Sequence, residues 1–124
     1  MSAPAKISDS EWEIMNIVWA RSPVASSEIV DELHAKRGWA SRTTRTLLDR
    51  LVKKKALVIN QDGKRYLYRP KVAMDACVRD ESRSFLDRVF GGEPGAMLAH
   101  FVKNADLTPE DIAELKRILN EKEK

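Results

Sequence analysis

Residues 41–70 read SRTTRTLLDR LVKKKALVIN QDGKRYLYRP, and this stretch decides the fold. In its first part, apolar residues recur at helical spacing, at Leu47, Leu48, Leu51 and Val52. The remaining surface carries basic and hydroxyl side chains, namely Arg42, Thr43, Arg45, Thr46 and Arg50. The pattern predicts an amphipathic helix that begins near Ala40 or Ser41 and exposes positive charge.

The second part of the stretch predicts a β-hairpin. Residues 57–60 and 65–69 are rich in β-branched, apolar and aromatic side chains, and residues 61–64 between them contain Asp-Gly, which supplies the positive φ angles of a tight turn. Pro70 cannot donate to a strand ladder and therefore closes the second strand. Two basic residues, Lys64 and Arg65, lie at the tip of this hairpin.

Two helices are predicted upstream. Ser8 and Glu11 have the spacing of a capping box, so the first helix begins there and ends near residues 21–23. Ser26 or Ser27 is expected to cap the second helix, which ends near Gly38; residues 23–25 between the helices form a connector or a minimal strand.

Three helices followed by a hairpin are the order of a winged helix-turn-helix domain. We predict a mainly α fold with a small β-hairpin wing, in which residues 1–70 form the winged helix head. The remaining residues, 71–124, are predicted to form a helical dimerisation segment.

The two parts differ in charge. Residues 1–70 carry 13 Lys and Arg against 8 Asp and Glu, whereas residues 71–124 carry 9 against 11. Residues 36–55 alone hold eight basic residues and a single acidic one, Asp49. The basic half is therefore the candidate for binding a polyanion, although a charge run of this kind can also be a solvated surface.

In a winged helix domain, the third helix lies in the major groove and the wing contacts the neighbouring backbone. The predicted base-contacting residues are Arg42, Thr43, Arg45 and Thr46. The predicted phosphate-contacting residues are Arg50, Lys53, Lys54, Lys64 and Arg65.

Helical patterns return from about Val72 to Phe90, from Pro94 to about Val102, and after Thr108, which has the spacing of a capping box with Asp111. Some fifty residues are too few to cover all their apolar positions, so we expect a second copy to cover them. The predicted dimerisation residues are Phe85, Leu86, Val89, Phe90, Met97, Phe101, Leu115 and Leu119.

The sequence contains no arrangement typical of an enzyme or a metalloprotein. Cys77 is the only cysteine, and the two histidines, His34 and His100, are far apart, so neither a metal site, a cofactor nor a catalytic centre is predicted. A role in packing is expected for Cys77. We also expect a cytoplasmic protein, because no apolar run is long enough for a membrane span and residues 1–6 lack the apolar core of a secretion signal.

From Ile7 to Glu121, the sequence resembles the BlaI/MecI-type penicillinase repressors, a family that also includes the CopY copper repressors. The resemblance is carried by the following residues: Ile7-Ser8-Asp9 with Glu11, Met15 and Val18-Trp19; Trp39 with Thr43, Thr46, Leu48, Arg50-Leu51 and Lys53-Lys54; Ala56-Leu57; Tyr68 with Pro70; and Ser84-Phe85-Leu86.

The resemblance implies a homodimeric repressor that binds inverted-repeat operator DNA and blocks transcription of β-lactamase or related resistance genes. It places Arg42, Thr43 and Thr46 at base-contacting positions. It also implies a membrane sensor protease of the BlaR/MecR type, which triggers cleavage in the dimerisation region between an Asn and a Phe. The matching pair here is His100-Phe101, so the Phe is kept and the Asn is not.

Two other departures from the family pattern matter. The chain ends without the cysteine-rich motif of the copper-responsive branch, which disfavours copper sensing. Lys55 stands where the family often has a Gly, which predicts a different end of the third helix. An alternative from another functional class is a winged helix module that binds a protein partner and does not bind specific DNA sequences.

Overall fold

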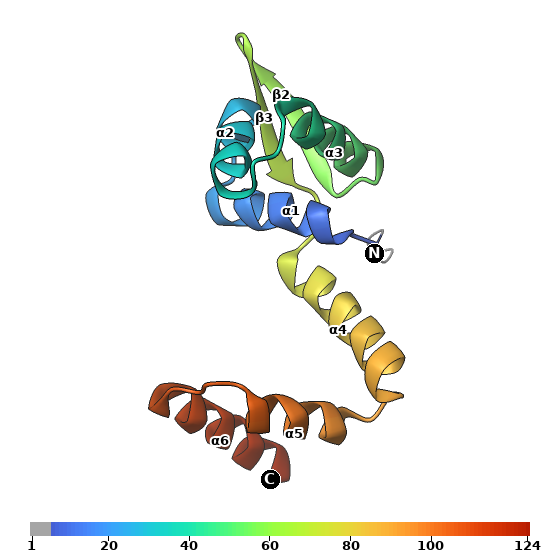
Figure 1. The fold of residues 1–124 in the computed structure, drawn as a ribbon, viewed down its shortest axis with the longest axis vertical. Helices are drawn as coiled ribbons and strands as arrows, with labels where there is room; N and C mark the ends of the chain where they lie inside the picture. The colour runs from blue at the N-terminus through green and yellow to red at the C-terminus, as the bar shows by residue number, and fades with distance from the viewer. Residues whose placement is uncertain (1–5) are drawn as a thin grey trace. The chain divides into compact units, whose positions relative to one another are not determined.

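The structure, a computed structural model, describes residues 6–124 (Figure 1). Residues 1–5, which contribute to the expectation of no secretion signal, lie outside the described residues. The chain forms two compact units that divide between Asp80 and Glu81. Among the helices of the described part, none has the length of apolar sequence that a bilayer crossing requires. The elements are α1 (Asp9–Arg21), β1 (Val24–Ala25), α2 (Ser26–Arg37), α3 (Ser41–Lys53), β2 (Leu57–Asp62), β3 (Arg65–Pro70), α4 (Met74–Phe90), α5 (Pro94–Asn104) and α6 (Pro109–Glu123).

The first unit has the predicted winged helix architecture. The helices α1, α2 and α3 pack around a three-stranded antiparallel sheet with the strand order β1-β3-β2 (Figure 1). The residues between α1 and α2 form the minimal strand β1, in which Val24 pairs with Tyr68. The tip of the β2–β3 hairpin projects beyond the helices as the wing.

The core of this unit contains the apolar stripes that the sequence predicts for the three helices. Trp12 and Trp19 are partly buried at its edge, and the indole Nε1–H of Trp19 donates to the carbonyl oxygen of Val72 at 3.0 Å. This bond fastens the segment after the wing to α1. The most deeply buried apolar residues are Ile14, Met15, Val18, Val24, Ile29, Leu33, Leu48, Leu51 and Leu57.

Both ends of α1 agree with the sequence. The Ser8 Oγ accepts from the backbone N–H of Glu11 at 3.2 Å, and the Glu11 carboxylate accepts from the N–H of Ser8 at 2.8 Å. This reciprocal pair is the predicted capping box, and the helix ends at Arg21.

The prediction that Ser26 or Ser27 caps α2 is wrong. The N-cap is Ala25, which makes no side-chain capping bond, and Ser26 is the first helical residue. The cause is the sheet: Ala25 pairs with Leu67 and so already has the extended backbone of an N-cap residue. At the other end, the prediction is confirmed, since Gly38 has the left-handed conformation of a helix terminus.

The wing has longer strands and a shorter turn than the sequence predicts. Gln61 pairs with Tyr66 and Asp62 pairs with Arg65, so the ladder extends into residues expected to form the turn. Only residues 63–64 lie between the strands, and only Gly63 has a positive φ, of 64°.

Helix α3 ends in a Schellman turn whose left-handed residue is Lys55, with a φ of 66°. The N–H of Ala56 donates to the carbonyl of Leu51, and the N–H of Lys55 donates to that of Val52, both at 3.0 Å. The prediction that Lys55 gives the third helix a different end is therefore wrong: the helix stops as it would with a glycine at this position, at the cost of a strained lysine.

The second unit comprises the C-terminal part of α4 with α5 and α6. Aromatic rings join α4 to α5: the Phe85 centroid lies 6.0 Å from that of Phe90 and 6.1 Å from that of Phe101. Thr108 and Asp111 form the predicted capping box of α6. The limits of the other helices differ slightly from expectation, since α4 starts at residue 74 and α5 extends to residue 104.

Candidate nucleic-acid interface

Helix α3 divides its side chains between core and surface as its sequence predicts. Leu47, Leu48 and Leu51 are buried, together with Thr44. The predicted base-contacting residues are all exposed, and they are Arg42, Thr43, Arg45 and Thr46. Exposure does not identify a DNA contact, so the base-reading role of these four stays a prediction.

The N-terminal end of α3 is suited to an anion. Its N-cap, Ala40, has no side chain to accept from the first N–H groups, and no acidic residue lies in the first turn. Free N–H groups at a helix N-terminus carry partial positive charge and readily donate to phosphate oxygens. The helix therefore combines a positive terminus with positive side chains.

The positive charges on this surface are not neutralised inside the chain. Within the part that the structure describes, no carboxylate lies at ion-pair distance from Arg42, Arg45, Arg50 or Lys53. Arg45 donates from Nε to the hydroxyl of Ser41 at 3.2 Å, which orients its side chain without removing its charge.

A hollow of about 310 Å³ is lined by residues of both α3 and the wing. It brings Arg45 together with two wing residues that the sequence assigns to phosphates, Lys64 and Arg65. Arg65 lies 3.8 Å from Asp62, and both side chains are largely exposed, so this pair is weak. The hollow is lined by Ala25, Ser26, Ser27, Arg45, Lys64, Arg65 and Tyr66.

The sequence reasoning missed the contribution of α2 to this hollow. Ser26 and Ser27 were expected to cap α2, but they lie at its N-terminus beside the basic groups, where their hydroxyls can donate to an anion. The wing adds the exposed aromatic ring of Tyr66. The Ser-Ser pair at the start of a helix is the sequence signal for a polar lining here.

Lys54 differs from the other predicted phosphate contacts. Its Nζ lies 2.6 Å from Oε1 of Glu11, whose side chain is completely buried, and it also donates to the carbonyl of Lys6 at 2.9 Å. Burial raises the pKa of Glu11, but hydrogen bonds from Lys54 and Ser8 and the charge of Lys54 outweigh it, so the pKa lies below its usual value. Among the described residues, Lys54 therefore has a carboxylate partner inside the fold, unlike Arg50 and Lys53, the other phosphate contacts predicted on α3.

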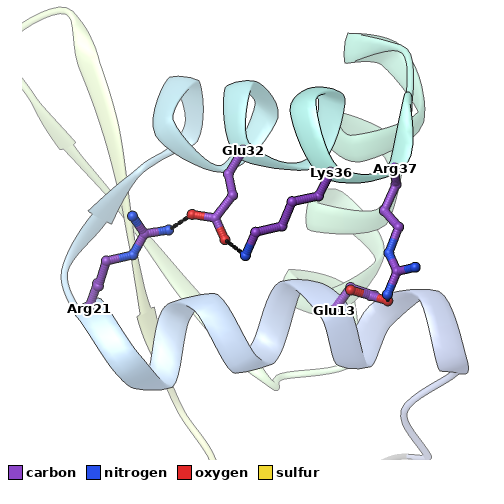
Figure 2. Close-up of polar contacts among 5 residues, drawn as sticks. All are labelled: Glu13, Arg21, Glu32, Lys36 and Arg37. Carbon is purple, nitrogen blue, oxygen red and sulfur yellow. Dashed lines mark hydrogen bonds and ion pairs between the residues drawn. The ribbon is translucent and has the colours of Figure 1, made fainter.

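Two further basic residues of the 36–55 run are also paired internally. Figure 2 shows Glu32 of α2 between Arg21 and Lys36, the latter at 3.0 Å, and Glu13 of α1 at 2.5 Å from Arg37. The Arg21–Glu32 and Arg37–Glu13 pairs tie α1 to α2, whereas the Lys36–Glu32 pair lies within α2. Within the 36–55 run, the basic residues that have no carboxylate at ion-pair distance among the described residues are therefore Arg42, Arg45, Arg50, Lys53 and Lys55.

The residues predicted for dimerisation all belong to the second unit, but they differ in exposure. Val89, Phe101 and Leu119 are exposed, whereas the other five are half-buried. Additional apolar side chains that the dimerisation prediction did not include are also exposed, namely Leu98, Val102, Ile112 and Ile118.

The predicted cleavage pair lies within α5. The carbonyl oxygen of His100, at the His100-Phe101 peptide bond, accepts from the side-chain amide of Asn104 at 2.8 Å. Both His100 and Phe101 are exposed in the described chain.

Comparison with known proteins gives a consistent result. The family model described as Penicillinase repressor matches residues 7–121. The Penicillinase repressor of Bacillus licheniformis is 35% identical over 116 residues, which are 94% of this chain and 91% of that protein. The Methicillin resistance regulatory protein MecI of Staphylococcus aureus strain N315 is 33% identical over 117 residues, covering 94% and 95% of the two chains.

Solved structures are also similar to this chain. The DNA binding domain of the repressor BlaI has a TM-score of 0.55 and 33% identity, over 60% of this chain and 90% of that one. The monomeric form of Bacillus licheniformis BlaI, solved in complex with the blaP half-operator, has the same TM-score and identity over 61% and 93%. A regulator of the Staphylococcus aureus efflux pump MepA, MepR, has 15% identity and a TM-score of 0.50, covers 93% of this chain and 76% of that one, and shares the fold alone.

Proposed function

Because the chain belongs to the penicillinase repressor family, we propose that it is a DNA-binding transcriptional repressor. The observation that carries this proposal is the exposed face of α3, where positive side chains have no carboxylate partners among the described residues. A solved relative with 33% identity is bound to a half-operator, which supports DNA as the partner of this face. The named relatives are a Penicillinase repressor and a Methicillin resistance regulatory protein, so we propose no enzymatic activity for the chain.

In the proposed repressor, α3 is the recognition helix. Its N-terminal turns carry Arg42, Thr43, Arg45 and Thr46, and these enter the major groove. Arginine can donate two hydrogen bonds to the acceptors of one guanine, and a threonine methyl can pack against the methyl of thymine. These contacts supply the sequence preference.

The phosphate contacts come from around the recognition helix. Arg50 and Lys53 extend the positive surface of α3, and Lys64 and Arg65 extend it onto the wing. The hollow between Arg45 and the wing has the positive charge and the hydrogen-bond donors needed to bind one phosphate group. Such contacts fix the orientation of the protein but do not distinguish sequences. Lys54 is left out of this set because Glu11 holds its charge.

A homodimer completes the proposed repressor. Residues 1–70 bind DNA and residues 71–124 join two copies, which then meet the two halves of an inverted-repeat operator. Support comes from the number of large apolar side chains that the second unit leaves exposed, including Leu98, Phe101 and Leu119.

The family resemblance supplies the proposed biological setting. The repressor acts in the cytoplasm, where its DNA is, on genes for β-lactamase or related resistance proteins. A membrane sensor protease induces these genes through cleavage at His100-Phe101 in α5. Cutting the chain there separates α6 from the rest of the second unit and removes apolar surface from the dimer contact.

A salt titration tests DNA binding by the whole chain. Labelled DNA from the promoter region of its own gene is titrated with the protein at several salt concentrations, and log K is plotted against log salt. We expect a steep fall with a slope of about −0.9 for each phosphate contacted. A flat response would reject the proposal and favour the winged helix module that binds a protein partner.

A further inference from the structure

The carboxylate of Glu11 lies in the first turn of α1 and has no exposed surface. Its Oε1 accepts from the backbone of Ser8 at 2.8 Å and from Lys54 Nζ at 2.6 Å, while its Oε2 has no partner among the described residues. A buried carboxylate with an unused oxygen depends strongly on its counter-ion, because removal of one member of such a pair leaves an uncompensated charge.

Lys54 is the C-cap of α3 and stands at the junction between the recognition helix and the wing. The Schellman turn at Lys55 follows it directly, and Ala56 then accepts at its carbonyl from the N–H of Lys71 at 2.8 Å. The second bond of Lys54, to the carbonyl of Lys6, attaches the same junction to the segment that enters α1. The side chain of Lys54 therefore connects the C-terminal end of α3 to the start of α1.

We infer that Glu11 and Lys54 form a positioning pair, in which Lys54 holds the C-terminal end of α3 against α1 and does not contact a phosphate. The inference rests on the proposed DNA-binding function. Recognition of bases requires the side chains of α3 to be held at a fixed angle, and the bonds of Lys54 contribute by fixing the C-terminal end of the helix against α1. The neighbouring Lys53 has an exposed side chain and no carboxylate partner among the described residues, so it stays a predicted phosphate contact.

The matched lysines allow a direct test. A duplex is first selected by the wild-type chain from a random-sequence pool, and binding to it and to a scrambled duplex is measured at several salt concentrations, with the active fraction set by stoichiometric titration. We expect Lys54→Met to weaken binding to the selected duplex by about tenfold, as the loss of one base contact would, and to leave the salt slope unchanged. Lys53→Met should weaken binding to both duplexes and reduce the slope by about 0.9.

Glu11→Gln separates the positioning role of Lys54 from a phosphate-contacting role, because the two roles predict opposite changes in DNA binding. If the pair positions α3, the variant discriminates less between the selected and scrambled duplexes. If Lys54 is a phosphate contact that Glu11 restrains, the freed lysine binds both duplexes more tightly and the slope becomes steeper, which would overturn the inference. Lys54→Arg keeps a positive charge opposite Glu11, so it should discriminate between the two duplexes better than Lys54→Met does. A change in stability alone does not alter this ratio, because only folded, active protein is counted.

The double variant Glu11→Gln/Lys54→Met covers the case in which a single variant fails to fold. It buries no charge, so we expect it to fold and to bind the selected duplex more tightly than any folded single variant of the pair, with the wild-type slope. A slope reduced by about 0.9 in the double variant would show that Lys54 contacts phosphate, and would overturn the inference. If the wild-type chain selects no duplex, the proposed function itself fails, and that result is separate from any comparison of variants.

Discussion

The backbone N–H of Lys55 donates to the carbonyl oxygen of Val52 at 3.0 Å, although the lysine must adopt a φ of 66° to do so. A side chain at this angle places its Cβ close to the following carbonyl, which costs about 1–2 kcal/mol. The hydrogen bonds of the turn and the ladder of β2 hold the residue in place. The end of α3 is therefore strained at a position where glycine would be free of that strain.

Lys55→Gly should raise the free energy of unfolding by about 0.5–1 kcal/mol, because the relief of strain exceeds the extra entropy that glycine loses on folding. Urea denaturation measures the change. Lys53→Gly, two residues earlier and inside the helix, is the control and should lower the stability by about 1 kcal/mol. Equal destabilisation by both changes would contradict the strain.

Thr44→Val should stabilise the fold. Thr44 is completely buried, and its hydroxyl has no hydrogen-bond partner among the described residues. Valine has nearly the same shape without the polar atom, so we expect a gain of about 1 kcal/mol in the free energy of unfolding. The exposed Thr43→Val is the control, with a change within about 0.5 kcal/mol. A loss of stability in the Thr44 variant would mean that the hydroxyl has a partner in solution.

Arg42→Ala and Thr46→Ala should relax sequence preference, each at a cost of about 1–3 kcal/mol on the cognate site. Lys53→Ala should instead weaken binding to all DNA sequences alike, because a phosphate contact carries no base information. Binding of each variant to cognate and scrambled duplexes measures both effects. The same profile for all three would show that the division into base and phosphate contacts is wrong.

Acid should weaken the fold through Glu11. Its pKa is lower in the folded chain than the usual 4.5, so its contribution to stability is present above pH 4.5 and is lost as the pH falls through the folded-state value. Glu11→Gln removes a group that takes up a proton on unfolding. We expect its stability to fall less steeply than that of the wild type below pH 4.5, as measured by urea midpoints across the pH range. Parallel curves would exclude this linkage.

Leu119→Asp should produce monomers. Leu119 is 55% exposed on α6, so we expect its replacement to leave the fold of one copy intact. Phe85 packs against Phe90 and Phe101 within its own unit, so its replacement would disturb folding as well. Sedimentation equilibrium measures the mass, and Asn120→Asp is the control for the added charge. A Leu119 variant that sediments like the wild type would place the dimer contact elsewhere.

Local signals predicted much of this structure. The capping boxes at Ser8 and Thr108 and the glycine at the end of α2 each depend on residues a few positions apart, and all three are confirmed. The alternation of core and surface along α3 is likewise a property of one helix. The winged helix fold followed from the order of these elements.

The features that the sequence did not predict arise where distant segments meet. The N-cap of α2 is Ala25 because strand β1 pairs with β3, a contact across more than forty residues that no local pattern announces. Lys54 looks like its neighbour Lys53 in the sequence, and only the fold brings Glu11 to it. A charge count over residues 36–55 likewise includes Lys36 and Arg37, which acids of α1 and α2 neutralise.

The lone thiol of Cys77 is 2% exposed, and burial, with the charge of Asp80, raises its pKa. Both effects slow the reaction of the thiol with alkylating or oxidising reagents as long as the first unit stays folded. Cys77 is thus a natural chemical reporter. The rate at which a thiol reagent modifies it reports how often the first unit unfolds, and no engineered label is needed.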